Sequence, residues 1–162
     1  MTESQRQNPR VPSSPRLRVA IFGGSGYGGS ELLRILLFHP NAEIVLVTAN
    51  EHAGKPVGEV HKNLNGLTEL YFDKVPDDVS TLTDIELAFF ALPHGQALSH
   101  IPSLPKNVKV IDLSGDFRID DADIFKQFYK LDHAGDEVFT HATGTGGFSA
   151  STASVGLSPF NG

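Results

Sequence analysis

A glycine-rich stretch near the amino terminus constrains the fold of this chain more than any other feature. Residues 17–22 are mostly apolar, as in a buried strand, and five glycines follow within residues 23–29. The next residues, 30–38, have the apolar spacing of an amphipathic helix. Glycine permits both a sharp turn between such a strand and helix and the close approach of a pyrophosphate to the backbone. Because the N–H groups at a helix N-terminus are unpaired, the stretch predicts a phosphate-binding turn.

The segments after this turn alternate between strands and helices. A helix is predicted over residues 26–38 and an apolar strand over 43–48, which complete a βαβ unit of about 30 residues with the first strand. Further buried strands are predicted at residues 85–92 and 108–113, and a helix at 121–131. We therefore expect an α/β fold, Rossmann-like and doubly wound, with a mostly parallel sheet. Shorter elements are predicted at residues 57–64 (helix), 70–72 (strand) and 76–83 (helical turn).

The chain has the length of one domain, and its two ends differ in composition from the middle. At 162 residues there is little room for a second domain. Residues 1–16 are polar, rich in proline and serine, and lack the apolar core of a secretory signal, so we expect a disordered leader. Residues 17–137 form the predicted NAD(P)-binding domain. Residues 138–162 are rich in glycine, serine and threonine, and we expect a tail: a linker, a sheet-edge extension or a non-native terminus.

Charge and composition argue against several classes of function. The net charge of −6 disfavours general affinity for nucleic acids. No apolar run approaches the roughly 18 residues of a membrane span, so we expect a soluble, cytoplasmic protein. The chain has no cysteine, which excludes disulfides, thiolate metal sites and a cysteine nucleophile within these residues. The histidines show no metal-ligand spacing, and no metal site is predicted.

The ends of the first two predicted strands carry candidate cofactor contacts. The spacing Gly23-x-x-Gly26-x-x-Gly29, between a strand and a helix, favours nucleotide binding over a purely structural glycine turn. The hydroxyl of Ser25 can add a contact to phosphate. Glu51, just beyond the second strand, has two interpretations: a carboxylate that accepts a hydrogen bond from the 2′-hydroxyl of NAD, or a solvated loop residue.

Two further motifs follow later strands, at the edge where open α/β sheets bind ligands. Leu92-Pro93-His94-Gly95 ends the strand predicted at 85–92, and His94 is either a cofactor or substrate contact or a loop histidine without a role. Asp116-Phe117-Arg118 follows the next strand. Arg118 either holds a substrate carboxylate or phosphate through two hydrogen bonds or forms a structural ion pair with Asp116. No catalytic residue is predicted.

Four stretches resemble the N-terminal domain of the N-acetyl-γ-glutamyl-phosphate reductases, a family within the semialdehyde-dehydrogenase superfamily. They are residues 23–32, 52–56, 90–95 and 111–118. The glycine turn is shared with many dehydrogenases, whereas Ala-Leu-Pro-His-Gly and Asp-Phe-Arg at this spacing are much more specific. The resemblance runs from about residue 17 to 134, and its last few residues match more weakly.

This resemblance implies an NADP(H)-dependent oxidoreductase of arginine biosynthesis, with NAD as the alternative cofactor. The family reduces an acyl phosphate, N-acetyl-glutamyl phosphate, to a semialdehyde; a cysteine forms a thioester that hydride then reduces, and a histidine assists as acid and base. Arg118 is the predicted substrate-binding residue. The residues predicted to bind the cofactor are Gly23, Gly24, Ser25, Gly26, Tyr27, Gly28, Thr48, Asn50, Leu92, Pro93 and His94.

The chain departs from this family in several respects. It has no cysteine, it lacks the family's second domain, and its tail from about residue 138 is unlike the family. Asn50-Glu51 stands where many members carry a basic residue for the 2′-phosphate. We therefore expect a truncated cofactor-binding part that is inactive alone and that self-associates through exposed apolar surface. The alternatives are a stand-alone nucleotide-binding or regulatory module and a fragment of a lysine-pathway acyl-phosphate reductase.

Overall fold

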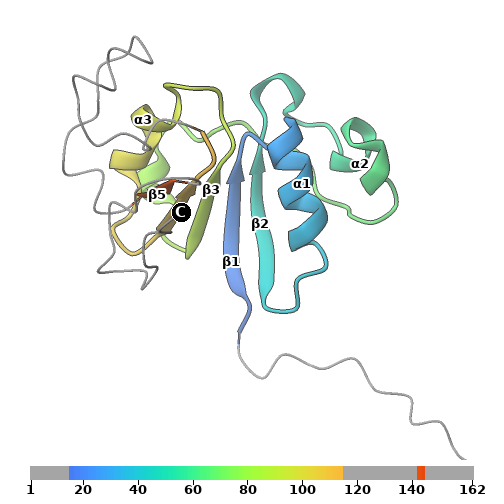
Figure 1. Cartoon of the computed structure of the whole chain (residues 1–162), viewed down its shortest axis with the longest axis horizontal. Coiled ribbons are helices and arrows are strands. Elements are labelled where there is room, and N and C mark those ends of the chain that lie inside the picture. Colours follow the sequence, from blue (N-terminus) through green and yellow to red (C-terminus); the bar gives the residue numbers. More distant parts are fainter. Residues whose placement is uncertain (1–14, 115–141, 145–162) are drawn as a thin grey trace, which may run out of the picture.

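The core of the molecule is a five-stranded sheet in which every neighbouring pair of strands is parallel. A computed structural model describes residues 15–114 and 142–144, and the strand order is β2-β1-β3-β4-β5 (Figure 1). This arrangement confirms the predicted α/β class with a Rossmann-like parallel sheet. The strands are β1 (Leu17–Phe22), β2 (Ala42–Thr48), β3 (Leu87–Phe90), β4 (Lys109–Asp112) and β5 (Ala142–Gly144).

Helices and helical turns connect the strands. The helix α1 (Tyr27–Leu36) joins β1 to β2 and ends two residues before the predicted boundary, where Leu37 donates its N–H to the carbonyl of Leu33. The helical segment predicted at 57–64 forms as two short pieces, and the turn predicted at 76–83 is also present. The remaining elements are α2 (Val57–Val60), α3 (Ala97–His100), and the 3₁₀ turns η1 (Asn50–His52), η2 (Lys62–Leu64), η3 (Val79–Thr81) and η4 (Ile101–Ser103).

Alternate residues of β1 belong to two separate hydrophobic cores, one on each face of the sheet. Val19 and Ile21 pack with Leu33 of α1, while Ala20 and Phe22 pack on the other face with Ala97 of α3. Figure 1 shows α1 beside β1 and β2, and α3 beside β3. Because side chains alternate along a strand, a strand buried on both faces must be apolar throughout, as this one is. The fold is therefore doubly wound, as predicted.

The carboxyl ends of the strands lie in one row. Phe22 pairs with Thr48 of β2 on one side and with Phe90 of β3 on the other, and Phe90 pairs with Asp112 of β4. After β2 the chain crosses to the other side of β1, so β1 and β3 flank the point at which the winding direction reverses. In open α/β sheets this reversal leaves a crevice between the turns that follow the two strands.

Two predicted elements differ from the structure for reasons of pairing. β3 is shorter than the predicted 85–92, because only residues 87–90 pair with β1 and β4. The strand predicted at 70–72 does not form; Tyr71 makes a single antiparallel bridge to Pro56, and Asp73 a single parallel bridge to Thr48. The helix predicted at 121–131 lies outside the described residues. β5 falls within the predicted tail and extends the sheet beside β4.

Within residues 15–114 and 142–144, no helix is both long and apolar enough to cross a membrane. No group of three or more histidine, aspartate or glutamate side chains in the same ranges is placed to hold a metal ion.

Candidate functional site

The glycine turn after β1 is anchored to the end of β2. The N–H groups of Gly23 and Gly24 both donate to the carbonyl of Thr48, at 3.1 and 2.8 Å. The hydroxyl oxygen of Thr48 lies 3.4 Å from the same Gly23 nitrogen. Gly26 donates to the carbonyl of Gly23 at 3.5 Å and closes the turn. These bonds fix the start of α1 at the carboxyl edge of the sheet.

Several N–H groups at the start of α1 have no acceptor among the described residues. The first helical bond of α1 runs from Ser30 N–H to the Gly26 carbonyl, at 2.8 Å. In the part of the chain that the structure describes, no carbonyl accepts from the N–H groups of Ser25, Tyr27, Gly28 or Gly29. Unpaired donors at a helix N-terminus, together with the helix dipole, form a ready site for an anion.

The glycines of the turn are required for different reasons. Gly23 has a φ of +85°, and a side chain there would overlap the Ala91 carbonyl in the loop after β3. A Cβ on Gly29 would lie 2.5 Å from the Gly23 oxygen and the Gly24 Cα, so α1 can approach the turn only with glycine at this position. A Cβ on Gly26 would meet only the Gly23 oxygen, at 3.9 Å. The space at Gly26 is therefore open to a ligand and is not needed for packing.

A cavity of about 450 Å³ lies at the carboxyl ends of β1, β2 and β3, at the reversal point of the sheet. Its volume falls within the range of roughly 300–1,000 Å³ that small-molecule and cofactor sites occupy. The lining residues come from the glycine turn, the end of β2, the segment after Asp73 and the loop after β3. They are Gly23, Ser25, Gly26, Thr48, Ala49, Asn50, Glu51, Val75, Ala91, Leu92, Pro93 and Gln96.

This cavity contains most of the residues predicted to bind a cofactor. Gly23, Ser25, Gly26, Thr48, Asn50, Leu92 and Pro93 all line it. Gly24 lies beneath the turn, where a Cβ would come within 2.8 Å of Val47. Gly28 and His94 are not among the lining residues, and His94 is exposed in the loop after β3. Arg118 and Asp116 lie outside the described residues.

Sequence reasoning missed several lining residues. Ala91 and Gln96 flank the Leu-Pro-His-Gly motif, so the position of that motif after a strand could have indicated them. Ala49 lies between two predicted residues. Val75 carried no signal in the sequence, because it reaches the cavity only through the bridge between Asp73 and Thr48.

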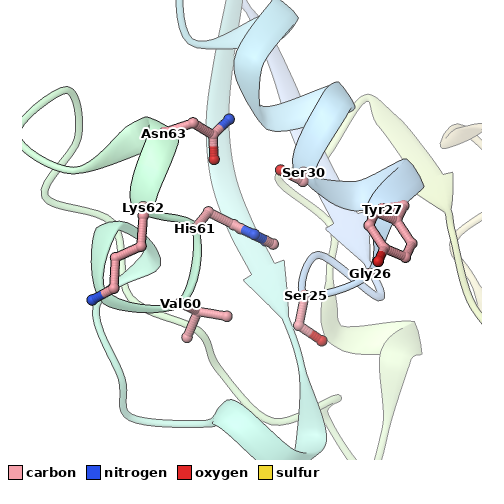
Figure 2. A pocket seen from close by; sticks show the side chains of 8 residues that line it. All are labelled: Ser25, Gly26, Tyr27, Ser30, Val60, His61, Lys62 and Asn63. Carbon is pink, nitrogen blue, oxygen red and sulfur yellow. The ribbon is translucent and has the colours of Figure 1, made fainter.

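A second cavity of about 340 Å³ lies beside the same turn. Figure 2 shows Ser25, Gly26 and Tyr27 on one side of it and Val60, His61, Lys62 and Asn63 on the other. The Nε2 atom of His61 is 2.8 Å from the Gly24 carbonyl oxygen. The ring of His61 is directed toward the glycine turn, whereas the ammonium group of Lys62 points away from it (Figure 2). Tyr27, predicted to contact the cofactor, lines this second cavity and is 99% exposed.

The strand β4 ends with a buried carboxylate. The Oδ1 atom of Asp112 accepts from the Ser114 N–H at 2.9 Å, and its Oδ2 accepts from the Ser114 hydroxyl at 2.8 Å. Both residues are buried. Hydrogen bonds from a nearby N–H and hydroxyl stabilise such a buried carboxylate.

Comparisons with known proteins agree with this geometry. A family model described as semialdehyde dehydrogenase, NAD binding domain, matches residues 18–161. N-acetyl-gamma-glutamyl-phosphate reductase from Nitrosococcus oceani is 42% identical over 127 residues, which cover 78% of this chain and 37% of the relative. The LysW-L-2-aminoadipate/LysW-L-glutamate phosphate reductase from Saccharolobus solfataricus is 44% identical over 124 residues, covering 73% of this chain and 34% of the relative. The chain thus spans about a third of the length of these relatives.

A solved structure shows the same fold. The aspartate semialdehyde dehydrogenase with NADP from Candida albicans has a TM-score of 0.54 and 16% identity, covering 66% of this chain and 32% of that chain. At this identity the likeness concerns the fold alone. The family model, in contrast, matches most of the chain, including the glycine turn and the strand ends that line the cavity. The chain therefore belongs to the semialdehyde dehydrogenase family, in which it corresponds to the NAD-binding domain.

Proposed function

We propose that the cavity at the carboxyl ends of β1, β2 and β3 binds a nicotinamide adenine dinucleotide, with its pyrophosphate at the glycine turn. The observation that carries this proposal is the turn itself. The N–H groups of Ser25, Gly28 and Gly29 have no acceptor among the described residues, and Gly26 leaves room for a phosphate beside them. When bound, the cofactor supplies the hydride of the reaction. The chain's own residues bind and orient it.

The full-length activity that we propose is the reduction of an acyl phosphate to a semialdehyde. The relatives named N-acetyl-gamma-glutamyl-phosphate reductase favour N-acetyl-glutamyl phosphate as the substrate, in arginine biosynthesis. The Saccharolobus relative, named for LysW-linked substrates, is as similar and supports a lysine-pathway acyl phosphate as the second candidate. Both substrates carry the same reacting group, so the glycine turn would serve either enzyme in the same way.

These 162 residues contain no cysteine, and therefore no thiol that could attack an acyl phosphate. We propose that they provide cofactor binding without the covalent step, so that the chain alone gives no NADPH- or NADH-dependent turnover of an acyl phosphate. Measurable reduction by the purified chain would contradict this part of the proposal. A stand-alone nucleotide-binding or regulatory module is the alternative, and it would show the same binding without any catalytic partner domain.

The residues that line the cavity just beyond β2 favour a cofactor without a 2′-phosphate. Asn50 and Glu51 line the cavity just beyond β2, where the adenosine ribose lies in related folds. No arginine or lysine of the described residues lines it. A carboxylate at this position attracts a 2′-hydroxyl and repels a 2′-phosphate. The family resemblance implies NADP(H), but on these residues we propose that this chain binds NAD(H) more tightly than NADP(H).

Binding of dinucleotides to the purified chain tests the proposal. Calorimetric titration with NADH and NADPH should give saturable binding, and either ligand, unlike ATP, should raise the unfolding temperature, since a ligand at 100 times its Kd stabilises by about 2.7 kcal/mol. Gly26→Ala is the matched variant, because its new methyl group meets no protein atom closer than 3.9 Å. We expect an unchanged unfolding temperature without ligand and a Kd at least tenfold weaker. No response of the parent chain to either dinucleotide would refute the assignment.

Cytoplasmic location and self-association are further parts of the proposal. Light scattering of the purified chain across a concentration series measures self-association directly. A mass that stays at one chain over the whole series would contradict it.

A further inference from the structure

We infer that His61 is a positioning residue for the pyrophosphate: its ring holds the peptide between Gly24 and Ser25 in the orientation that offers the Ser25 N–H to the cofactor. The inference rests on the proposed dinucleotide site and adds to it a residue far away in the sequence, which contacts the turn from the side opposite the ligand. His61 lies in the second cavity, between α2 and η2, and reaches the turn across it (Figure 2).

The hydrogen bond to the Gly24 carbonyl shows which ring nitrogen of His61 carries the proton. The Nε2 atom lies 2.8 Å from the Gly24 oxygen, and a carbonyl oxygen can only accept. His61 therefore donates from Nε2. The peptide bond that follows Gly24 is trans, so its carbonyl and the Ser25 N–H point in opposite directions. With the carbonyl held toward His61, the Ser25 N–H is directed away from His61, and it has no acceptor among the described residues.

The histidine is itself held firmly. Its N–H donates to the Val57 carbonyl at 2.8 Å, and its carbonyl accepts from Leu64 at 2.8 Å. The ring packs edge-on against Phe72, with centroids 5.8 Å apart and an interplanar angle of 75°. Phe72 is completely buried and lies directly under Gly24, where an added Cβ would come within 3.1 Å of its ring. These contacts hold the ring of His61 against the turn.

The turn needs such a restraint because glycine loses more conformational freedom than any other residue when it is ordered. Gly24 is fixed on one side by its N–H bond to Thr48, but its carbonyl side borders Ser25 and Gly26, which are held less strongly. If this peptide rotated, its carbonyl oxygen would replace an N–H at the anion site. A net hydrogen bond to a neutral group favours one orientation about fivefold, and that factor sets the expected effect on pyrophosphate binding.

Two substitutions at His61 separate this role from packing. His61→Phe keeps an aromatic ring against Phe72 but removes the donor. His61→Gln places an amide N–H near the position of Nε2 and should restore the bond. We expect His61→Phe to weaken the binding of NADH and of ADP-ribose about fivefold. His61→Gln should stay within about twofold of the parent chain, and adenosine, which has no pyrophosphate, should bind all three chains equally by NMR titration.

The outcomes distinguish this inference from the proposed function. Normal dinucleotide affinity in His61→Phe overturns the positioning role while the binding site stands, and so does an equal loss of adenosine affinity, which would indicate general damage. Absence of dinucleotide binding in the parent chain overturns both. A measurement on the parent chain covers the case in which His61→Phe fails to fold: ¹⁵N shifts of the neutral ring should show the proton on Nε2, and a proton on Nδ1 alone refutes the inference.

Discussion

Replacing Gly29 by alanine forces a methyl group into the contact between α1 and the glycine turn. The new Cβ would lie 2.5 Å from the Gly23 oxygen and the Gly24 Cα, well inside the 3.4 Å at which ordinary van der Waals contact begins. Both atoms belong to the backbone and cannot rotate away. The turn and the helix must therefore separate by several tenths of an ångström, which also disturbs the N–H groups that face the cavity.

Gly28 provides the matched control, because it lies in the same turn of the same helix. A Cβ there would meet only the Cβ of Ala91, at an ordinary 3.8 Å. Alanine in place of glycine in a helix gains up to about 1 kcal/mol. Overpacking against fixed atoms costs roughly 1–3 kcal/mol. We therefore expect Gly28→Ala to be neutral or slightly stabilising, and Gly29→Ala to lose about 2 kcal/mol of unfolding free energy.

Urea and thermal unfolding, followed by circular dichroism, measure the difference. For a chain of this size 1 kcal/mol corresponds to roughly 2–4 °C, so Gly29→Ala should unfold about 4–8 °C lower than the parent chain. Its affinity for NADH should also fall, since the start of α1 has moved. If Gly28→Ala and Gly29→Ala change the unfolding temperature equally, steric contact is not the reason for glycine at position 29.

Three further predictions concern the core, the pH response and the cofactor preference. Phe90 is fully buried and stacks on Phe22 with centroids 4.5 Å apart, so Phe90→Ala should lower the free energy of unfolding in urea by about 3–5 kcal/mol. Burial lowers the pKa of His100 from its ordinary 6.5. The imidazole of His100 therefore binds a proton more tightly in the unfolded chain than in the folded one. The free energy of unfolding is retained above pH 6.5 and falls as the pH drops below it. His100→Gln should reduce that fall in unfolding temperature between pH 7 and pH 5, and an unchanged slope would contradict the assignment. Glu51→Lys should shift the ratio of NADH to NADPH affinities about tenfold toward NADPH in calorimetric titration, whereas an unchanged ratio would remove Glu51 from the ribose site.

The first βαβ unit could be predicted from the sequence almost to the residue. The strand predicted at residues 17–22 is β1, and the one predicted at 43–48 is β2 with one more residue at its start. Apolar spacing and glycine placement determine this part, because a buried strand, a tight turn and an amphipathic helix each need a local pattern of residues. The same local signals indicated the glycine turn as the phosphate site and the strand ends as the edge of the cavity.

The individual roles of the residues in the site depended on contacts between distant segments. The sequence shows five glycines together, but only the packing reveals that Gly29 is required by the backbone of the turn and Gly26 is not. The Leu-Pro-His-Gly motif left two interpretations of His94 open, a cofactor or substrate contact or a loop histidine without a role. In the structure Gln96 lines the cavity, whereas His94 does not. The left-handed conformation of Gly95, with a φ of +86°, redirects the chain between these two residues.

The segment from Ala49 to Asp73 shows most clearly what tertiary structure alone decided. The sequence predicts a short helix at residues 57–64 and a short strand at 70–72 within it, but no local pattern connects this segment to the glycine turn. In the structure Asp73 donates to the Val47 carbonyl and accepts from the Ala49 N–H, which returns the chain to the end of β2. That return places Phe72 under Gly24 and His61 on its carbonyl. The sequence predicted a phosphate-binding turn, because the requirements of such a turn are local. The contacts that hold the turn in place come from segments distant in the sequence, and no local pattern encodes them.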